Sequence, residues 1–419
     1  MRIGYACKTV GVPGTQLKSC TLKNATHQNL TAIIGHNLQA LHSMLIYNHQ
    51  NGIKMFRLSS DIIPFATSAA ATLNWEELFA QELEQLQNFI AQSDIRISMH
   101  PGQYTVINSP IKDVVTRAKE DLDYHARLLD ALTPLASSKI ILHVGGVYGD
   151  KKAALERFIQ NYRTLPLKVT RRLVIENDER CYTAEEVLDL CKTLNAPAVF
   201  DNLHNLINPS ANPLDEALWI KQFAATWGKN DGRQKIHYSQ QAVDKRPGSH
   251  SPTIYFRPFL AFCEALQGQD VDIMLEVKDK NLSAVKCINC TQNATNTLVL
   301  EKEWAHYKYF ILEHAPQQYH AIRTNFREKE QPIAFLFYQK TEVALDAPIN
   351  TGNSANALNH VWGYFKDIAT PAEKAQWSKR ITGYLNGSNS LNTTKKWLLR
   401  MAQKYQQDYL LQSLYFYIE

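Results

Sequence analysis

The sequence has no apolar run long enough to cross a membrane. A membrane span needs about 18 apolar residues in succession, and no segment of the 419 residues approaches that length. The first ten residues, MRIGYACKTV, also lack the apolar stretch of a secretory signal, because Gly4, Tyr5 and Lys8 interrupt it. We therefore expect a cytoplasmic protein that does not associate with a membrane.

Cysteine is scarce, and its spacing is irregular. The seven cysteines are an odd number scattered over a long chain, which argues against the disulfide framework of a small secreted protein. Only Cys287 and Cys290 have the spacing of a metal-binding pair. A structural zinc site usually needs a second pair, and none follows. The sequence therefore gives a metal or redox role for this pair little support.

Charge of one sign is not in large excess. The net charge is +5, with 20% charged and 45% hydrophobic residues, which excludes disordered and collagen-like chains. This length and composition are typical of a folded enzyme with one large domain and a smaller one. The small net charge says little about nucleic acid binding.

Short apolar or β-branched runs alternate with longer segments of helical periodicity up to about residue 295. This alternation predicts parallel strands joined by crossover helices, and eight such units are the number that closes a (β/α)8 TIM barrel. We expect this barrel domain to span residues 1–295. The predicted strands are Arg2–Tyr5, Lys54–Leu58, Ile95–Met99, Lys139–Leu142, Arg172–Ile175, Ala198–Phe200, Gln234–His237 and Asp272–Glu276.

Capping signals predict where several helices begin. A potential N-cap residue followed three positions later by Glu occurs at Asn74–Glu77 and at Thr183–Glu186, which predicts helices running to Ile90 and to Leu194. The alternation stops after residue 295, so we expect a small all-α domain at residues 296–419. Its predicted helices are Glu301–His314, Ala355–Ile368, Pro371–Leu385, opened by a capping box from Thr370 to Glu373, and Thr394–Tyr405.

Ligand-capable side chains follow nearly every predicted strand. In a TIM barrel these positions converge on one mouth. A single His or Glu there is more often a structural residue, but several buried carboxylates without a counter-charge would be strongly unfavourable. The pattern therefore predicts divalent cations at the mouth. The residues are Tyr5, Ser59–Asp61, His100, His143, Glu176, Asp201, His204, Lys235, His237 and Glu276.

The mixed imidazole and carboxylate ligands suit Mn²⁺ or Zn²⁺ better than a metal that prefers thiolates. So many ligands indicate two or three ions, which is the usual arrangement for in-line attack on a phosphodiester. The loops after the strands are also basic, which would give a polyanion a positive rim, although a solvated surface is the alternative explanation. The basic residues are Lys8, Lys18, Lys23, Lys112, Lys151, Lys152, Lys245, Arg246, Lys278, Lys280 and Lys286.

These strand ends resemble the ultraviolet-damage endonuclease (UvdE/UvsE) family. Eight ordered matches span the barrel, and their order makes the resemblance specific. The matching stretches are Arg2–Tyr5, Phe56–Ser60 with Ile63–Phe65, His100–Thr105, His143–Gly146 with Tyr148–Lys151, Leu173–Asn177, Phe200–His204, Lys235–Ser239 and Ile273–Asp279.

The resemblance implies a DNA-repair endonuclease that uses up to three Mn²⁺ ions. It would hydrolyse the phosphodiester immediately 5′ to ultraviolet photoproducts and other lesions in double-stranded DNA, leaving a 3′-hydroxyl and a 5′-phosphate. The implied metal ligands are His100, His143, Glu176, Asp201, His204, His237, His250 and Glu276.

The resemblance also implies roles beyond metal ligation. Lys235 matches a lysine that the family carboxylates near the metals, and Gln103 with Tyr104 matches the pair that probes the duplex at the lesion. Tyr5 would lie beside the scissile phosphate, with Lys8 among the DNA contacts. An amide and an aromatic ring on an exposed loop can replace pairing and stacking where damaged nucleotides leave the helix.

Two positions depart from the family pattern. Thr67 and Ser68 stand where the family commonly has a His, and a hydroxyl cannot replace an imidazole as a strong metal ligand, so one ion would bind more weakly. Thr9 stands where some relatives have Asn, which puts a polar DNA contact in doubt.

The C-terminal tail resembles a second family. Residues 306–316 and 356–365 are similar to a YbgA-type helical domain of unknown function, with a purely stabilising appendage as the alternative.

The barrel also allows other functions. An apurinic endonuclease or a sugar isomerase could have the same barrel fold, and a chain that had lost catalysis would be a damage-binding protein. The loop His100–Tyr104 favours a large substrate over the closed pocket of an isomerase.

Overall fold

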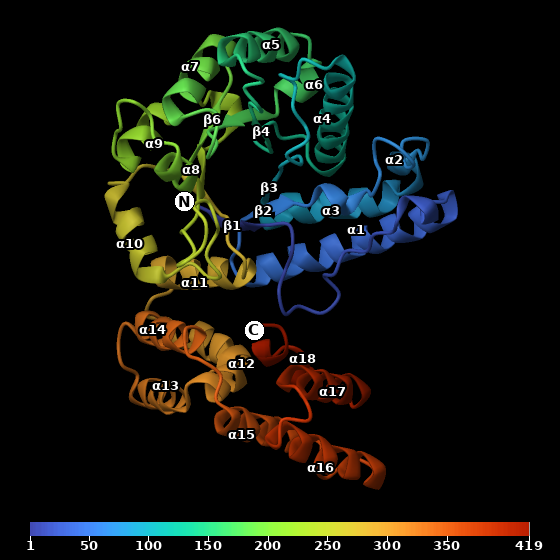
Figure 1. Ribbon diagram of the computed structural model, residues 1–419, viewed down its shortest axis with the longest axis vertical. Coiled ribbons are helices and arrows are strands. Elements are labelled where there is room, and N and C mark those ends of the chain that lie inside the picture. Colours follow the sequence, from blue (N-terminus) through green and yellow to red (C-terminus); the bar gives the residue numbers. More distant parts are fainter. Residues whose placement is uncertain (419) are drawn as a thin grey trace. The chain divides into compact units, whose positions relative to one another are not determined.

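Eight parallel strands close into a barrel, as predicted. The structure is a computed structural model that describes residues 1–418, and the strands follow chain order around the ring, with helices outside them (Figure 1). β8 closes the ring by pairing with β1. The strands are β1 (Ile3–Ala6), β2 (Met55–Leu58), β3 (Arg96–Met99), β4 (Ile140–His143), β5 (Leu173–Glu176), β6 (Ala198–Asp201), β7 (Lys235–Tyr238) and β8 (Asp272–Leu275).

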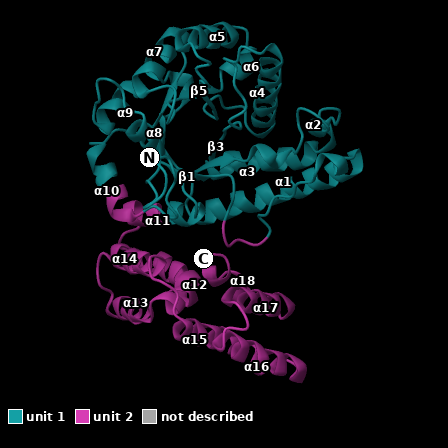
Figure 2. Ribbon diagram, in the orientation of Figure 1, with its two compact units in different colours: residues 1–9, 14–254, 261–285 teal, residues 10–13, 255–260, 286–419 magenta. Residues whose placement is uncertain are grey.

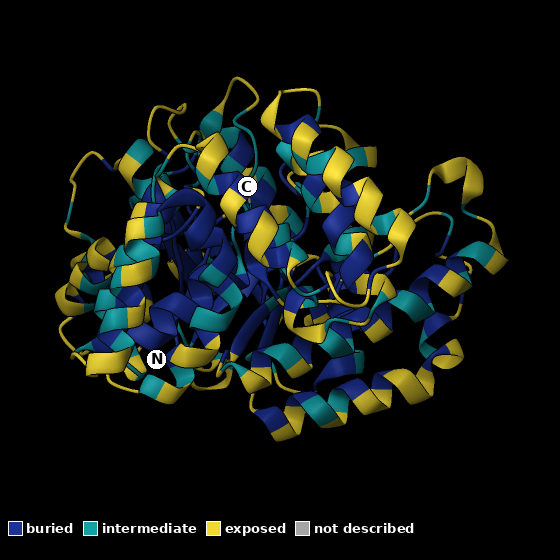
Figure 3. Ribbon diagram, turned by 90° about the horizontal axis from the view of Figure 1, so that it is seen from below, coloured by how far each residue is buried: buried dark blue, intermediate teal, exposed yellow. Residues whose placement is uncertain are grey.

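The strands are buried on both faces. Helices cover the outside of the ring and side chains fill its inside, so most strand positions are inaccessible to solvent (Figure 3). Strands buried in this way are encoded as short apolar runs, without the alternation of a half-exposed sheet. For this reason each predicted strand lies within one residue of the observed one at either end.

Helices connect consecutive strands. Thr183 forms the predicted capping box with Glu186 at the start of α7. The helices up to the end of the barrel sequence are α1 (His27–Gln50), α2 (Trp75–Leu78), α3 (Ala80–Ser93), α4 (Lys112–Leu132), α5 (Lys151–Arg163), α6 (Leu167–Thr170), α7 (Ala184–Leu194), α8 (Asn202–Ile207), α9 (Glu216–Ala224), α10 (Phe256–Ala265) and α11 (Asn281–Gln292), with 3-10 turns at Leu22–Asn24, Ser60–Ile62 and Lys229–Asp231.

The prediction of one capped helix from Asn74 to Ile90 is wrong. The Asn74 side chain makes no capping hydrogen bond, and α2 ends after a single turn. Phe79 leaves the helical conformation before α3 begins at Ala80. Trp75 and Phe79 are both buried, so we attribute the break to tertiary burial at these two positions, which outweighs the local capping signal.

The chain divides into two compact units (Figure 2). The first contains residues 1–9, 14–254 and 261–285, and the second contains residues 10–13, 255–260 and 286 onward. The second unit is helical. Its helices are α12 (Thr297–His314), α13 (Pro316–Glu328), α14 (Ile333–Leu345), α15 (Thr351–Trp362), α16 (Pro371–Leu385), α17 (Leu391–Lys404) and α18 (Asp408–Leu411), followed by a 3-10 turn at Leu414–Phe416.

The helical tail agrees with the sequence prediction in part. α16 has the predicted bounds and the Thr370–Glu373 capping box. Helices α13 and α14 were not predicted. α14 is apolar on most of its circumference and lacks one-sided periodicity, whereas α13 is amphipathic and could have been predicted from its pattern. Within residues 1–418, no helix is long and apolar enough to cross a membrane.

Candidate metal centre

The carboxyl ends of six neighbouring strands, β3 to β8, bring imidazoles and carboxylates into the barrel mouth. His143 of β4 lies opposite Glu176 of β5, and Asp201 of β6 lies opposite His237 of β7. Because alternate residues of a strand point to the same face, these strand-end side chains share the interior. His100 follows β3, His204 lies in α8, and Glu276 follows β8.

Glu176 is at the centre of this group, and its carboxylate is fully buried. Its Oε2 lies 3.2 Å from Nε2 of His100 and 3.4 Å from Nε2 of His143. Its Oε1 lies 2.6 Å from Nδ1 of His237 and 3.8 Å from Nδ1 of His204. One carboxylate therefore contacts or approaches four imidazoles.

The two glutamates remain anionic. Burial by itself would raise the pKa of Glu176, but His237 and the hydrogen bonds from His100 and His237 lower it well below its usual value. For Glu276, burial is likewise outweighed, mainly by the Arg57 guanidinium, which contacts the carboxylate and holds its pKa well below the usual range. Two negative charges therefore persist in the mouth at neutral pH.

The surrounding groups respond to burial and to these charges. Burial lowers the pKa of His143 to about 4, so its imidazole is neutral and can donate a lone pair to a metal. Burial would also lower the pKa of His204, but the charges of Asp201 and Glu176 raise it to about 9. Burial raises the pKa of Asp201. The raised pKa of His204 reflects the negative charge of the neighbouring carboxylates, so the cluster favours cations.

The residues fit divalent cations. Each of three overlapping groups offers ligand atoms that all lie within 4.8 Å of one another, and Glu176 and Asp201 each belong to two of them. Asp201 Oδ2 and His237 Nε2 are buried without a hydrogen-bond partner. Such unsatisfied atoms are costly, and metal coordination would satisfy them. The groups are His100, His143 and Glu176; Glu176, Asp201 and His204; and Asp201, His237 and Glu276.

His250 reaches the same mouth from the segment between β7 and α10. Its Nε2 lies 3.8 Å from Oε2 of Glu276, although His250 belongs to none of the three groups within the described residues. It is therefore placed beside the cluster, close enough for a modest side-chain movement to add a ligand.

Lys235 lies inside the barrel but closer to the amino ends of the strands. It is fully buried, and its Nζ has no hydrogen-bond partner. Burial lowers its pKa well below the usual value, and the positive charge of Arg96 adds to this shift. Lys235 and His237 are alternate residues of β7 and lie on the same, inward face.

Tyr5 is not brought into the cluster. Its hydroxyl donates to Asn48 Oδ1 of α1 at 2.9 Å and lies 2.7 Å from the Thr9 hydroxyl. Tyr5 alternates with Ala6, which packs inside the barrel against Met55, so the tyrosine points outward. Lys8 is exposed.

The predicted probe residues are exposed in the loop between β3 and α4. The Tyr104 side chain is 72% exposed, and Gln103 is also exposed. The loop is anchored by Thr105, whose hydroxyl donates to Asp121 Oδ2 at 2.5 Å. The two side chains therefore project from a firmly held base.

Two other loop positions bear on the sequence interpretation. Ser68 is exposed, and its hydroxyl donates to the Phe65 carbonyl oxygen, so the position where the family commonly has His supplies no substitute ligand. Lys286 does not belong to the basic rim, contrary to prediction. It lies in the middle of α11, away from the loop after β8, and it is buried and pairs with Glu342 at 2.8 Å.

Sequence reasoning missed Arg57, which contacts Glu276 from β2. A charged residue in an otherwise apolar strand, two positions after the inward-facing Met55, was a usable signal.

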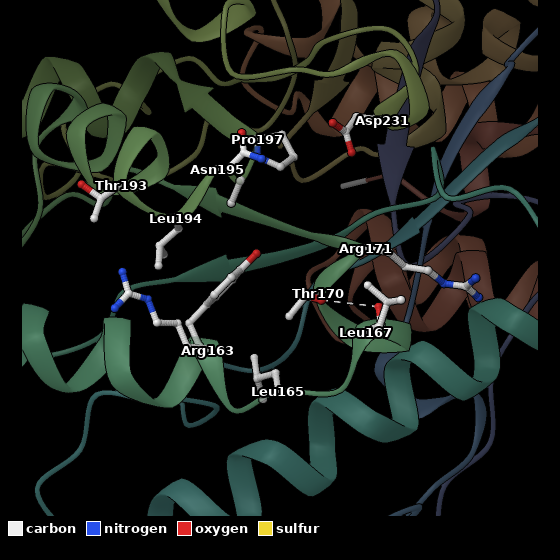
Figure 4. Close-up of a pocket in the computed structure, with 12 residues that line it drawn as sticks. Arg163, Leu165, Leu167, Thr170, Arg171, Thr193, Leu194, Asn195, Pro197 and Asp231 are labelled. Atoms are coloured by element: carbon white, nitrogen blue, oxygen red, sulfur yellow. Dashed lines mark hydrogen bonds between the residues drawn. The ribbon is translucent and has the colours of Figure 1, made fainter.

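Cys287 and Cys290 are buried in α11 and are not joined by a disulfide. A cavity of about 490 Å³ lies before β5 and β6, at the opposite strand ends from the cluster; Figure 4 shows Arg163, Leu194 and Arg171 on its wall.

Comparisons with known proteins agree with this geometry. A family model for the UV-endonuclease UvdE matches residues 1–303, and a model for a protein of unknown function (DUF1722) matches residues 308–418. A UV DNA damage endonuclease of Clostridium perfringens is 42% identical over 321 residues, which are 75% of this chain and 77% of that protein.

Two further relatives cover the barrel. A UV DNA damage endonuclease of Bacillus cereus (strain G9842) is 32% identical over 300 residues, which are 69% of this chain and 94% of that protein. The crystal structure of SacUVDE has 35% sequence identity and a TM-score of 0.66, and the alignment covers 70% of this chain and 98% of that one.

We predict that Mn²⁺ stabilises the protein and that Glu176→Gln removes most of this effect, because Glu176 belongs to two of the three groups. Mn²⁺ at about 100 times its dissociation constant should raise the free energy of unfolding of the unsubstituted protein by about 2.7 kcal/mol. The measurement is denaturant unfolding with and without the metal. The control is Glu156→Gln on the exposed face of α5. Equal stabilisation of both variants would contradict the assignment.

Proposed function

The chain belongs to the UV-endonuclease UvdE family, and on that premise we propose that it cuts DNA immediately 5′ to ultraviolet photoproducts and other lesions. The products would be a 3′-hydroxyl and a 5′-phosphate. The observation that carries the proposal is the set of three overlapping ligand groups at the barrel mouth, joined through Glu176 and Asp201. Its site of action would be the cytoplasm.

The bound cations, two or three Mn²⁺ in this proposal, would supply a reactive water and charge stabilisation at the phosphate. The chain's own residues hold the ligand atoms in place. Arg57 keeps Glu276 anionic, and neutral His143 keeps a free lone pair. The eight proposed ligands are His100, His143, Glu176, Asp201, His204, His237, His250 and Glu276.

Lesion recognition is assigned to Gln103 and Tyr104. Both are exposed, and the tyrosine ring lies over Gly102, where an added Cβ would come within 2.4 Å of its Cε1 atom. The glycine therefore permits this ring position. Phosphate contacts from residues such as Lys8 would orient the duplex, while the amide and the ring would probe its stacking. The position of Tyr5 gives no support to a contact with the scissile phosphate.

We also propose that Lys235 becomes carboxylated. Its Nζ is buried without a partner, and its electrostatic neighbours include Arg96 and Arg57. Burial keeps the amine neutral, so it would add to carbon dioxide and release one proton, which gives a carbamate whose negative charge lies near these guanidinium groups. It would also lengthen the side chain and bring oxygen ligands closer to the mouth.

The two-domain assignment follows from the same data. Residues 1–295 would form the catalytic domain, and residues 296–419 the helical domain of unknown function. Family-model matches to residues 1–303 and 308–418 support this proposed division, as does a compact unit whose longest segment begins at residue 286.

Replacing Glu276 with Gln should abolish cleavage and leave the fold intact. The substitution keeps the side-chain size but removes the negative charge beside Arg57 and His237. We expect nicking of ultraviolet-irradiated plasmid to fall by more than about 100-fold, as in loss of metal-site residues. Chelator should have the same effect on the unsubstituted protein. Near-normal nicking by a variant with an unchanged circular dichroism spectrum would refute the assignment.

Replacing Gln103 and Tyr104 together with Ala should weaken discrimination between damaged and intact duplex more than it weakens general DNA binding. These side chains would read the lesion, whereas phosphate contacts determine the salt-sensitive part. Competition binding with lesion-bearing and intact duplexes measures both. Leu167→Ala, at an exposed apolar position on α6, is the control. A variant with unchanged discrimination would count against the probe.

The carbamate on Lys235 should be detectable by carbon NMR. Protein equilibrated with ¹³C-labelled bicarbonate at alkaline pH should show a carbamate resonance that Lys235→Arg lacks. A crystal structure with metals bound should show density extending beyond Nζ. If that density ended at a bare amine, the modification would be excluded, and Lys235 would remain an unmodified interior lysine.

A further inference from the structure

A short hairpin projects between β7 and α10 on the mouth side of the barrel. Gln241 and His250 form an antiparallel bridge at its base. The Ala242 amide donates to the Ser249 carbonyl oxygen at 2.7 Å, and the Ser251 amide donates to that of Gln240 at 2.8 Å. We call residues 240–251 the β7–α10 hairpin. It carries His250 toward Glu276.

The side chain of Gln241 organises the inside of this hairpin. Its Nε2 donates to the carbonyl oxygens of Ala242 and Arg246, each at 3.0 Å. Its Oε1 accepts from the Gly248 amide at 2.9 Å. One amide group therefore satisfies backbone atoms on both arms of the loop and holds the tip in a defined shape.

The tip combines an apolar side chain with two cations. Val243 is 76% exposed, a larger fraction than the 72% of Tyr104 in the proposed probe loop. The exposed Asp244 follows it, and then come Lys245 and Arg246, which are both exposed, so the two cations exceed the single carboxylate at the tip. A single exposed valine is ordinary by itself. Here it stands on a hydrogen-bonded hairpin beside two cations, and that hairpin begins at the metal cluster.

We propose that the β7–α10 hairpin is a second DNA-contacting arm, which binds duplex DNA beside the lesion. Lys245 and Arg246 contact phosphates, and Val243 packs against the apolar edges of the sugars in the groove. The assignment rests on the proposed function. It adds a recognition element that is separate from Gln103 and Tyr104 and emerges from a different strand.

The position of the hairpin beside the cluster and the charges of Lys245 and Arg246 support this DNA contact. The hairpin base is tied to the cluster by the 3.8 Å approach of His250 Nε2 to Glu276 Oε2. Any phosphodiester that reaches the cluster therefore brings its neighbouring phosphates near this loop. Two adjacent cations suit such a polyanion, and a small apolar side chain suits its sugars.

The test measures binding of a short intact duplex in chelator, so that cleavage is not needed. Fluorescence anisotropy over a salt series gives affinity and the slope of log K against log salt. Lys245→Ala combined with Arg246→Ala should reduce the steepness of this slope by about 1.8, because each phosphate contact contributes about 0.9. Val243→Ser should weaken binding by roughly tenfold with the slope unchanged, because it removes an apolar contact.

The matched control replaces two exposed cations at the opposite strand ends, Arg163→Ala with Lys229→Ala, and should leave the slope unchanged. An unaltered slope in the hairpin double variant would overturn the phosphate contacts, and unaltered affinity in Val243→Ser would overturn the apolar contact. Plasmid nicking is assayed separately. Hairpin-dependent binding without nicking would refute only the proposed function, and normal nicking with hairpin variants that bind normally would refute only the arm.

Discussion

The burial of Glu176 and its neighbouring carboxylates is the constraint on which the mouth of this barrel depends. A closed ring of parallel strands directs strand-end side chains into a space that water reaches poorly. Carboxylates there must meet positive charge. Arg57 meets part of this demand at Glu276, and four imidazoles surround Glu176. Asp201 Oδ2 and His237 Nε2 are buried without a hydrogen-bond partner, and divalent cations would coordinate these two atoms.

Contacts that stabilise the barrel and residues of the candidate metal site lie at opposite ends of its strands. At the amino ends, Arg96 pairs with the fully buried Asp272 at 3.0 Å. Ala6, Met55 and Met274 pack together in the barrel interior. At the carboxyl ends, apolar contacts give way to ligands and exposed loops. Lys235 lies at the level of Asp272, near the amino ends, and its Nζ is buried without a hydrogen-bond partner, so this interior amine needs a chemical explanation.

Much of this arrangement could be predicted because the determinants are local. Apolar runs predicted the positions of all eight strands, and parallel connectivity implies that their carboxyl ends lie on one side of the barrel. His100, His143 and Glu176 could therefore be assigned to one site from the sequence. Prediction failed where distant contacts decide. α2 ends after one turn, between the buried residues Trp75 and Phe79, and Lys286 pairs with Glu342, which lies 56 positions away in the sequence.

The sequence by itself determined the number and order of strands and the identity of most mouth residues, because both are encoded in short apolar runs and in the residues that follow them. Only the tertiary structure decided which of these side chains meet. Tyr5 turned toward Asn48 of α1, whereas Arg57 turned inward to Glu276. Side-chain direction depends on the register and inward face of each strand in the closed ring, and a single strand does not specify these.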